Sequence, residues 1–363
     1  MPASPVVDLL RPELSEITPY VPHPGEYAVR LDANEAPPLF SAAARARLAE
    51  EAGQLAAERY PDAQAEALRA ALAERTGVSA AEVLVGVGSD EIITMLLTAF
   101  AQPRERMPTP VVLTTTPTFV MYAMSAKVRG QRVLEVPLDA NWDLATTSLS
   151  AAFRVAEPSV VFLASPNNPT GNQFSLARLI ELIEALPRSL IVVDEAYVDY
   201  SEQNQLELYR RFENVVILRT LSKIGFAGLR VGWLVARPEL IREIDKVRQP
   251  YNMSSLSQRL GALAVTELAP EIRGVVSYVV GERTRVAGAL AELSRVHVTP
   301  SQANFLWVQT ERPALEVFEG LKARGVLVRS FHARGGRLAH QLRVTIGTIA
   351  ENDAFLASFR ELV

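Results

Sequence analysis

The chain has 363 residues, 48% of them hydrophobic, which is enough for a large core and predicts two or more domains. Its formal net charge is −4 and no basic block stands out, so nucleic acid is a poor candidate partner. The absence of cysteine excludes disulfides and thiolate ligands, and no membrane span or secretory signal is visible, so we expect a cytoplasmic protein.

The first 250 residues predict an arm followed by an α/β region. Eight of the 23 prolines lie within residues 1–38, which favours an extended arm over residues 1–40. Next, β-rich runs alternate with helical runs, which predicts βαβ units and a mostly parallel sheet flanked by helices. The predicted strands are 82–87, 111–114, 132–136, 160–164, 190–193 and 215–218, and the predicted helices are 41–59, 64–75, 92–100, 119–127 and 175–186.

The pattern changes after residue 251. Long helices are predicted as far as about residue 293, and a mixed region follows. Its predicted strands are 305–308, 326–329 and 341–346, and its predicted helices are 314–323 and a last one from 352. The chain is therefore assigned to the α/β class, with an arm at 1–40, a large α/β domain at 41–250 and a small α+β domain at 251–363.

Polar side chains follow four of the predicted strands at the point where each strand ends. These segments begin at Gly88, Ser165, Asp194 and Arg219. In an open α/β sheet, ligands bind at the carboxyl ends of the strands, so we expect these segments to form one site. The four histidines are scattered and show no metal-ligand spacing, so no metal site is predicted.

The segment around Lys223 carries the chemistry of a covalent cofactor site. A lysine can form an imine with an aldehyde, and Ser222 and Arg230 can bind a phosphate. Asp194 would be costly to bury unpaired, and it could pair with a protonated heteroaromatic nitrogen. Plainer interpretations stay open at this point, because Lys223 could be a surface lysine and Asp194 could cap a turn.

Two other segments have equally ordinary alternatives. Ser89 could cap a helix rather than bind an anion at its N-terminus. Asn168, bracketed by prolines, could belong to a simple tight turn.

Several motifs together resemble the fold-type I pyridoxal-phosphate aminotransferases. They are SPNNPTG at 165–171, DEAY at 194–197, TLSK at 220–223 and AGLR at 227–230. Further stretches are similar to the histidinol-phosphate aminotransferases and cover nearly the whole chain in order. They are LDANEAP at 31–37, RYPD at 59–62, GSDE at 88–91, PTFVMY at 117–122, SQANF at 301–305 and LRVTIGT at 342–348.

The resemblance implies pyridoxal 5'-phosphate as the cofactor and a role for each residue around its ring. Lys223 would bind the cofactor covalently and later move a proton. Asp194 would pair with the ring nitrogen, while Asn168 and Tyr197 would bind the ring oxygen. Phe119 would stack on the ring, although the family often has a tyrosine at this position.

The resemblance also implies a phosphate site and a shared dimer site. The backbone amides of Ser89 and Asp90, with Ser222 and Arg230, would bind the cofactor phosphate. The loop from Lys223 to Arg230 is one residue shorter than in many aminotransferases, which predicts a local backbone difference. Tyr60 would reach the cofactor phosphate of the neighbouring subunit, so the active unit would be a homodimer.

The substrate pocket follows from the same resemblance. Arg343 would bind a carboxylate or phosphate of the substrate, and Tyr20, Asn34 and Arg329 would complete the pocket.

The implied reaction is transamination between L-histidinol phosphate and 2-oxoglutarate in histidine biosynthesis. An aromatic amino-acid aminotransferase or a decarboxylase of a phosphorylated amino acid is the alternative within the same fold. A cofactor-binding regulator is disfavoured, because the segment ahead of the fold has no helix-turn-helix pattern.

Overall fold

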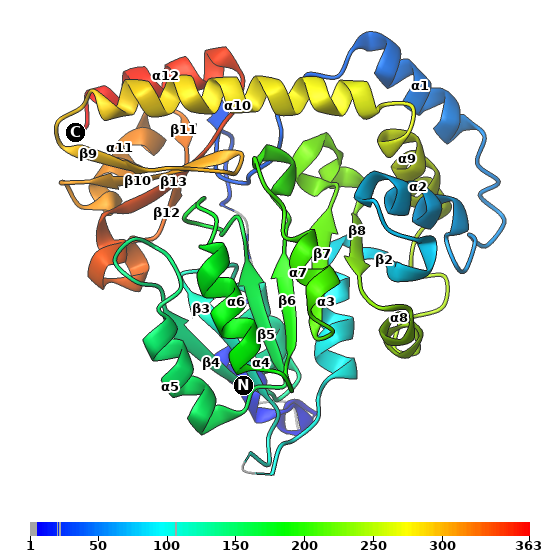
Figure 1. Cartoon of the computed structure of the whole chain (residues 1–363). Coiled ribbons are helices and arrows are strands. Elements are labelled where there is room, and N and C mark those ends of the chain that lie inside the picture. The colour runs from blue at the N-terminus through cyan, green and yellow to red at the C-terminus, as the bar shows by residue number, and fades with distance from the viewer. Residues whose placement is uncertain (1–5, 20, 22, 106) are drawn as a thin grey trace.

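A seven-stranded sheet forms the centre of the computed structural model, which describes residues 6–19, 21, 23–105 and 107–363 (Figure 1). The strand order is β2-β8-β7-β6-β5-β3-β4, and only β8 runs antiparallel to its neighbours. This arrangement confirms the predicted α/β class with a mostly parallel sheet. The strands are β2 (Val83–Val87), β3 (Val111–Thr116), β4 (Arg132–Pro137), β5 (Val160–Ala164), β6 (Leu190–Asp194), β7 (Val215–Thr220) and β8 (Val231–Val235).

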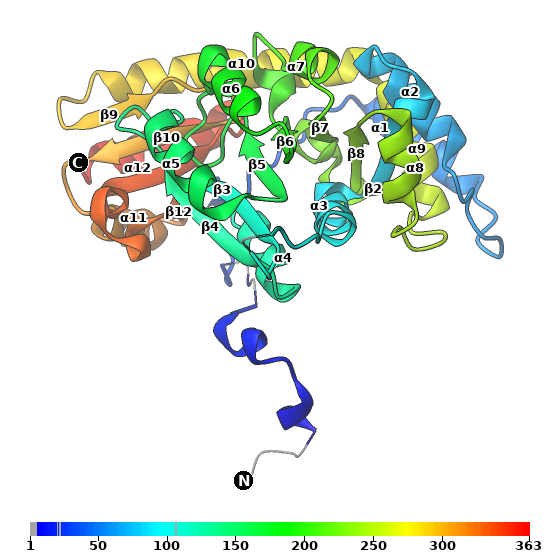
Figure 2. The ribbon, with the colours of Figure 1, turned by 60° about the horizontal axis from the view of Figure 1, so that its bottom comes forward.

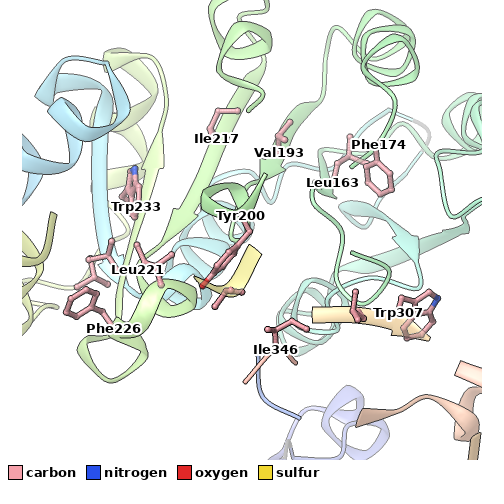
Figure 3. Packing of buried hydrophobic residues seen from close by; sticks show 14 of the residues in the cluster. Leu163, Phe174, Val193, Tyr200, Ile217, Leu221, Phe226, Trp233, Trp307 and Ile346 are labelled. Carbon is pink, nitrogen blue, oxygen red and sulfur yellow. The ribbon is translucent and has the colours of Figure 1, made fainter. Parts of the chain in front are cut away.

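Helices cover both faces of this sheet because its central strands are apolar on both sides. In β5, Val161 and Leu163 join one buried cluster, whereas Phe162 joins the cluster on the opposite face. Figure 3 shows Leu163, Val193 and Ile217 on neighbouring strands within the first cluster. That cluster includes side chains of α2 (Glu66–Thr76), α5 (Thr146–Ala156), α6 (Leu176–Ala185) and α7 (Leu206–Arg211), and the other includes α3 (Gly88–Ala99), α4 (Met121–Val128) and α8 (Pro238–Asp245).

A four-stranded antiparallel sheet of order β12-β13-β10-β9 lies beside the large sheet (Figure 1). Its strands are β9 (Val296–Thr299), β10 (Phe305–Thr310), β12 (Arg329–Ser330) and β13 (Gln341–Thr345), and the helices of this region are α11 (Ala314–Ala323) and α12 (Ile349–Arg360). The 23-residue helix α10 (Ala269–Ala291) runs across both parts of the molecule. No helix within the described residues has the length and apolar character needed to cross a bilayer.

The N-terminal segment is tied to the C-terminal region. Strand β1 (Val29–Arg30) pairs in parallel with β11 (Val326–Leu327). Helix α1 (Ala42–Gly53) follows, and it packs against α9 (Ser255–Val265). The predicted domain boundaries at residues 40 and 250 stay a prediction.

Several predicted elements differ from the structure. The arm is not uniformly extended, since 3₁₀ helices occupy Val7–Leu9 and Pro12–Glu16, in a segment that projects from the body in Figure 2. The first predicted helix stops at Gly53 instead of residue 59. The predicted strand 326–329 is two strands, β11 and β12, which belong to different sheets. Strands β8 and β9 and helices α5, α7 and α8 were not predicted.

Gly232 in β8 lets this strand approach the start of α3. A Cβ at this position would lie 2.5 Å from the carbonyl carbon of Gly88 and would also meet the backbone nitrogen of Ser89. We expect Gly232→Ala to destabilise the protein by about 1–3 kcal/mol, because backbone has to move to relieve the clash. Denaturant unfolding measures the change.

Gly274 in α10 provides the matched control, because an added Cβ there would meet nothing within 4 Å. We expect Gly274→Ala to be neutral or stabilising by up to about 1 kcal/mol, since alanine favours helix. Equal stability of the two variants would show that the close approach at Gly232 is unimportant.

Candidate active site

A cavity of about 500 Å³ lies where β2, β5, β6 and β7 end, and residues of β12 and β13 line its other side. The sequence therefore correctly predicted that the strand ends converge. The cavity is lined by twelve of the predicted site residues: Asn34, Ser89, Asp90, Phe119, Asn168, Asp194, Tyr197, Ser222, Lys223, Arg230, Arg329 and Arg343.

Asp194 is the last residue of β6, the middle strand of the large sheet, and only 4% of it is exposed. One carboxylate oxygen accepts a hydrogen bond from the Tyr122 hydroxyl at 2.5 Å, and the other accepts from the Ala196 backbone N–H at 2.9 Å. Burial raises the pKa of Asp194 to about 6, and the Tyr122 hydrogen bond opposes the increase. The site thus holds a buried carboxylate that ionises near neutral pH.

Lys223 follows β7 in a turn whose backbone is fixed at several points. Its Nζ lies 5.9 Å from the centroid of the Tyr197 ring, and its carbonyl oxygen accepts from the Tyr200 hydroxyl at 2.5 Å. Gly225 has φ +101°, and a Cβ there would lie 2.6 Å from the Phe40 ring. The turn therefore requires glycine at this position, and it directs Lys223 into the cavity.

A candidate anion site lies at the start of α3, in the same cavity as Lys223. The first N–H groups of a helix have no partner within the helix, and those of Ser89 and Asp90 lie at the edge of the cavity. Arg230 Nη2 lies 3.2 Å from the Asp90 carboxylate, so the short loop does not turn Arg230 away from this site. Ser222 is buried, and its hydroxyl accepts from that of Thr220 at 2.9 Å. A hydroxyl, a guanidinium and backbone donors suit a phosphate dianion.

The predicted ring-oxygen donors are each held by a residue from outside the large sheet. Arg343 in β13 donates from Nη1 to the Asn168 side-chain oxygen at 2.7 Å. Asn34 donates from Nδ2 to the Tyr197 hydroxyl at 2.9 Å, and its own backbone N–H donates to Thr345. These contacts connect the N-terminal segment, the large sheet and the small sheet at one point.

Of the predicted residues that the structure describes, Tyr60 does not line the cavity. Tyr60 is 81% exposed and stacks on Tyr251, with ring centroids 4.7 Å apart. The Tyr60 ring is therefore accessible from outside its own subunit. Tyr20 lies outside the described residues.

Sequence reasoning assigned no role to Tyr122 and did not single out Asp32 or Arg334, although all three line the cavity. Tyr122 lies in the PTFVMY stretch that carries part of the resemblance, three residues after Phe119 on the same turn of chain. That helical spacing was the available signal, because it places both rings on one face. Their rings indeed meet edge to face at 5.5 Å.

Comparison with known proteins identifies the relatives of this chain. Residues 26–359 match the family described as aminotransferase class I and II. Histidinol-phosphate aminotransferase 2 of Cupriavidus pinatubonensis is 39% identical over 336 residues, covering 91% of this chain and 90% of the relative. Histidinol-phosphate aminotransferase of Methylibium petroleiphilum is 37% identical over 357 residues, covering 98% of this chain and 94% of the relative.

A solved structure has the same fold. The histidinol-phosphate aminotransferase of Sinorhizobium meliloti, in complex with pyridoxal-5'-phosphate, superposes with a TM-score of 0.85. It is 24% identical in sequence, and the match covers 97% of each chain.

The raised pKa of Asp194 predicts how this residue affects stability. The folded protein holds the Asp194 proton more tightly than the unfolded chain, because burial raises the pKa from 3.8 to about 6. Ionisation at higher pH therefore opposes folding. In protein without bound ligand, we expect Asp194→Asn to be more stable than the wild type at pH 8, by up to about 3 kcal/mol.

Denaturant unfolding at several pH values measures this difference. The advantage of the variant should be complete above about pH 6, should shrink as the pH falls, and should vanish below about pH 3.8, where the wild-type carboxyl is neutral in both states. A wild type that is as stable as the variant at pH 8 would show that burial of this carboxylate carries no penalty.

Proposed function

Because this chain belongs to the class I and II aminotransferases, we propose that it transfers the amino group of L-histidinol phosphate to 2-oxoglutarate. The products are imidazole-acetol phosphate and glutamate. The observation that carries the proposal is the series of relatives named histidinol-phosphate aminotransferase, at 37–39% identity over more than 90% of the chain. The cofactor of this enzyme is pyridoxal 5'-phosphate.

The residues of the cavity fit this cofactor. The donors of Ser89, Asp90, Ser222 and Arg230 would bind its phosphate, and Asp194 would face the ring nitrogen. When bound, the cofactor supplies a protonated ring that withdraws electrons from the substrate α-carbon. The Asp194 carboxylate, which Tyr122 and Ala196 hold in place, would keep that nitrogen protonated through its negative charge.

Lys223 would have two tasks in this geometry. Its Nζ would bind the cofactor covalently, and as a free amine the same nitrogen would remove the proton from the substrate Cα. The fixed turn keeps Nζ within the cavity beside Tyr197. Tyr197 and Asn168 would hydrogen-bond the ring oxygen and so set the angle of the ring.

Arginines at the opposite side of the cavity would recognise the substrates. Arg329 and Arg343 are cross-strand partners in β12 and β13, so their side chains lie on the same face of the small sheet. A planar guanidinium can bind either a carboxylate or a phosphate through two hydrogen bonds. The pair would therefore accept glutamate in one half-reaction and histidinol phosphate in the other, with Asn34 and Tyr20 completing the pocket.

We also propose that the enzyme works as a homodimer in which Tyr60 contributes to the neighbouring site. The ring of Tyr60 is exposed on the surface of its own subunit, where a partner could contact it. The cytoplasmic location stays a prediction of the sequence.

A screen of amino donors tests the proposed substrate against its alternatives. Holoenzyme is mixed with histidinol phosphate, phenylalanine or threonine phosphate, and the change in cofactor absorbance is followed in single turnover. We expect histidinol phosphate to react with a kcat/KM at least about tenfold higher than either alternative. Faster reaction of phenylalanine would favour the aromatic aminotransferase, and release of carbon dioxide from threonine phosphate would favour the decarboxylase.

Mixing two defective variants tests the shared site. Lys223→Ala and Tyr60→Ala are each expected to be impaired as pure dimers. In a mixed dimer both substitutions fall in one site and the other site is intact, so activity should rise above the sum of the parents, to about a quarter of the wild-type value. A mixture whose activity equals the summed activities of the two separate variants would contradict a site shared in this way. Wild-type subunits that carry two different affinity tags, mixed in the same way and isolated on both tags, control for subunit exchange.

A further inference from the structure

Arg334 lines the same cavity but has no assigned role. It ends the 3₁₀ helix His332–Arg334, which follows β12 directly. The residue is exposed, and within the described part of the chain it makes no ion pair or side-chain hydrogen bond. Its guanidinium is therefore available to a ligand in the cavity.

The backbone that carries Arg334 is well fixed. The Phe331 ring packs edge to face on Trp307 at 4.9 Å, and its N–H donates to the Gln341 carbonyl at 3.1 Å. The Arg334 N–H donates to the Phe331 carbonyl, also at 3.1 Å. The turn is thus anchored on the small sheet, and Arg334 lines the same cavity as Arg329.

Positive charge accumulates at this side of the cavity. Arg329 and Arg343 lie directly opposite each other across β12 and β13, and like charges in such pairs are destabilising. Arg334 adds a third guanidinium. Such an arrangement is unfavourable in the free protein and becomes favourable when an anion with a high charge density binds.

The acidic residues that line the cavity do not offset this charge. Asp90 pairs with Arg230, and Asp194 is buried at the end of β6. Asp32 lies 3.6 Å from Arg30 Nε, so its charge is shared with an arginine outside the cavity lining. A monocarboxylate would neutralise only one of the three guanidiniums, whereas a phosphate dianion carries about twice that charge.

We propose that Arg334 is a specificity-determining residue that binds the phosphate of the amino donor, together with Arg329. This inference rests on the proposed function, because it names the residue by which the site distinguishes a phosphorylated donor from a carboxylate-bearing one. Arg343 is held by hydrogen bonds to the Asn168 side chain and the Asp32 carbonyl, and with Arg329 it can accept either a carboxylate or a phosphate. The third guanidinium is needed only by the more highly charged phosphate. Arg334 therefore supplies binding energy mainly to the phosphorylated substrate.

The test compares donors with and without phosphate in holoenzyme that carries Arg334→Gln. The ratio of kcat/KM for histidinol phosphate to that for histidinol is measured in the wild type and the variant. We expect this ratio to fall about ten- to a hundredfold, through KM rather than kcat, because one charge-assisted contact to phosphate is lost. The KM for glutamate should change much less, and Arg334→Lys should restore part of the ratio.

Arg273→Gln is the matched control. Arg273 is exposed on α10 and does not line the cavity, so its loss removes the same charge without touching the site. An equal fall in the ratio for both variants would mean that the overall positive charge of the protein, and not a contact in the cavity, sets the preference for the phosphorylated donor. That result would overturn the proposal.

The remaining outcomes separate this inference from the proposed function. If the wild type prefers histidinol phosphate and Arg334→Gln keeps the same ratio, only the role of Arg334 is wrong. If the wild type does not use histidinol phosphate, the proposed function fails, and the same ratio is measured with threonine phosphate and threonine. A wild type that prefers no phosphorylated donor would overturn both.

Discussion

A carboxylate buried at the end of the middle strand is the constraint on which the site depends. Asp194 is almost fully buried, and its two hydrogen bonds, from Tyr122 and Ala196, do not neutralise its charge. Such a group is unfavourable in an empty site and favourable beside a cation. The fold therefore carries an instability that a protonated ring nitrogen would relieve. The sheet order places Lys223, at the end of the neighbouring strand, at the same edge of the sheet.

The small sheet and the N-terminal segment supply the residues that orient two side chains at the strand ends of the large sheet. Arg343 binds Asn168, and Asn34 binds Tyr197, so both ring-oxygen donors are oriented by residues far away in the sequence. Because Asn34 also binds Thr345, a displacement of the small sheet would move both donors together. The arginines proposed to bind the substrates are carried by that same sheet, so recognition of the substrate would be coupled to the angle of the cofactor ring.

The parallel sheet and the strand ends were predictable because β-branched runs followed by polar turns are local signals, as at Asp194 and Ser222. Other features depend on contacts that the sequence does not display. The antiparallel strand β8 needs Gly232 against the start of α3, a close approach visible only in three dimensions. Arg334 has no motif of its own, since its position results from a turn that Phe331 anchors on Trp307. The role of Tyr122 likewise depends on the distance to Asp194, 72 residues away.

The most direct test of the account is to identify the lysine that holds the cofactor. Holoenzyme is reduced with borohydride, which fixes the cofactor on its lysine, and the protein is digested and analysed by mass spectrometry. The account predicts the pyridoxyl group on Lys223 and on no other lysine, because only Lys223 among the described lysines lines the cavity. Labelling of a different lysine, or of none, would contradict the claim that the four strand ends form this cofactor site.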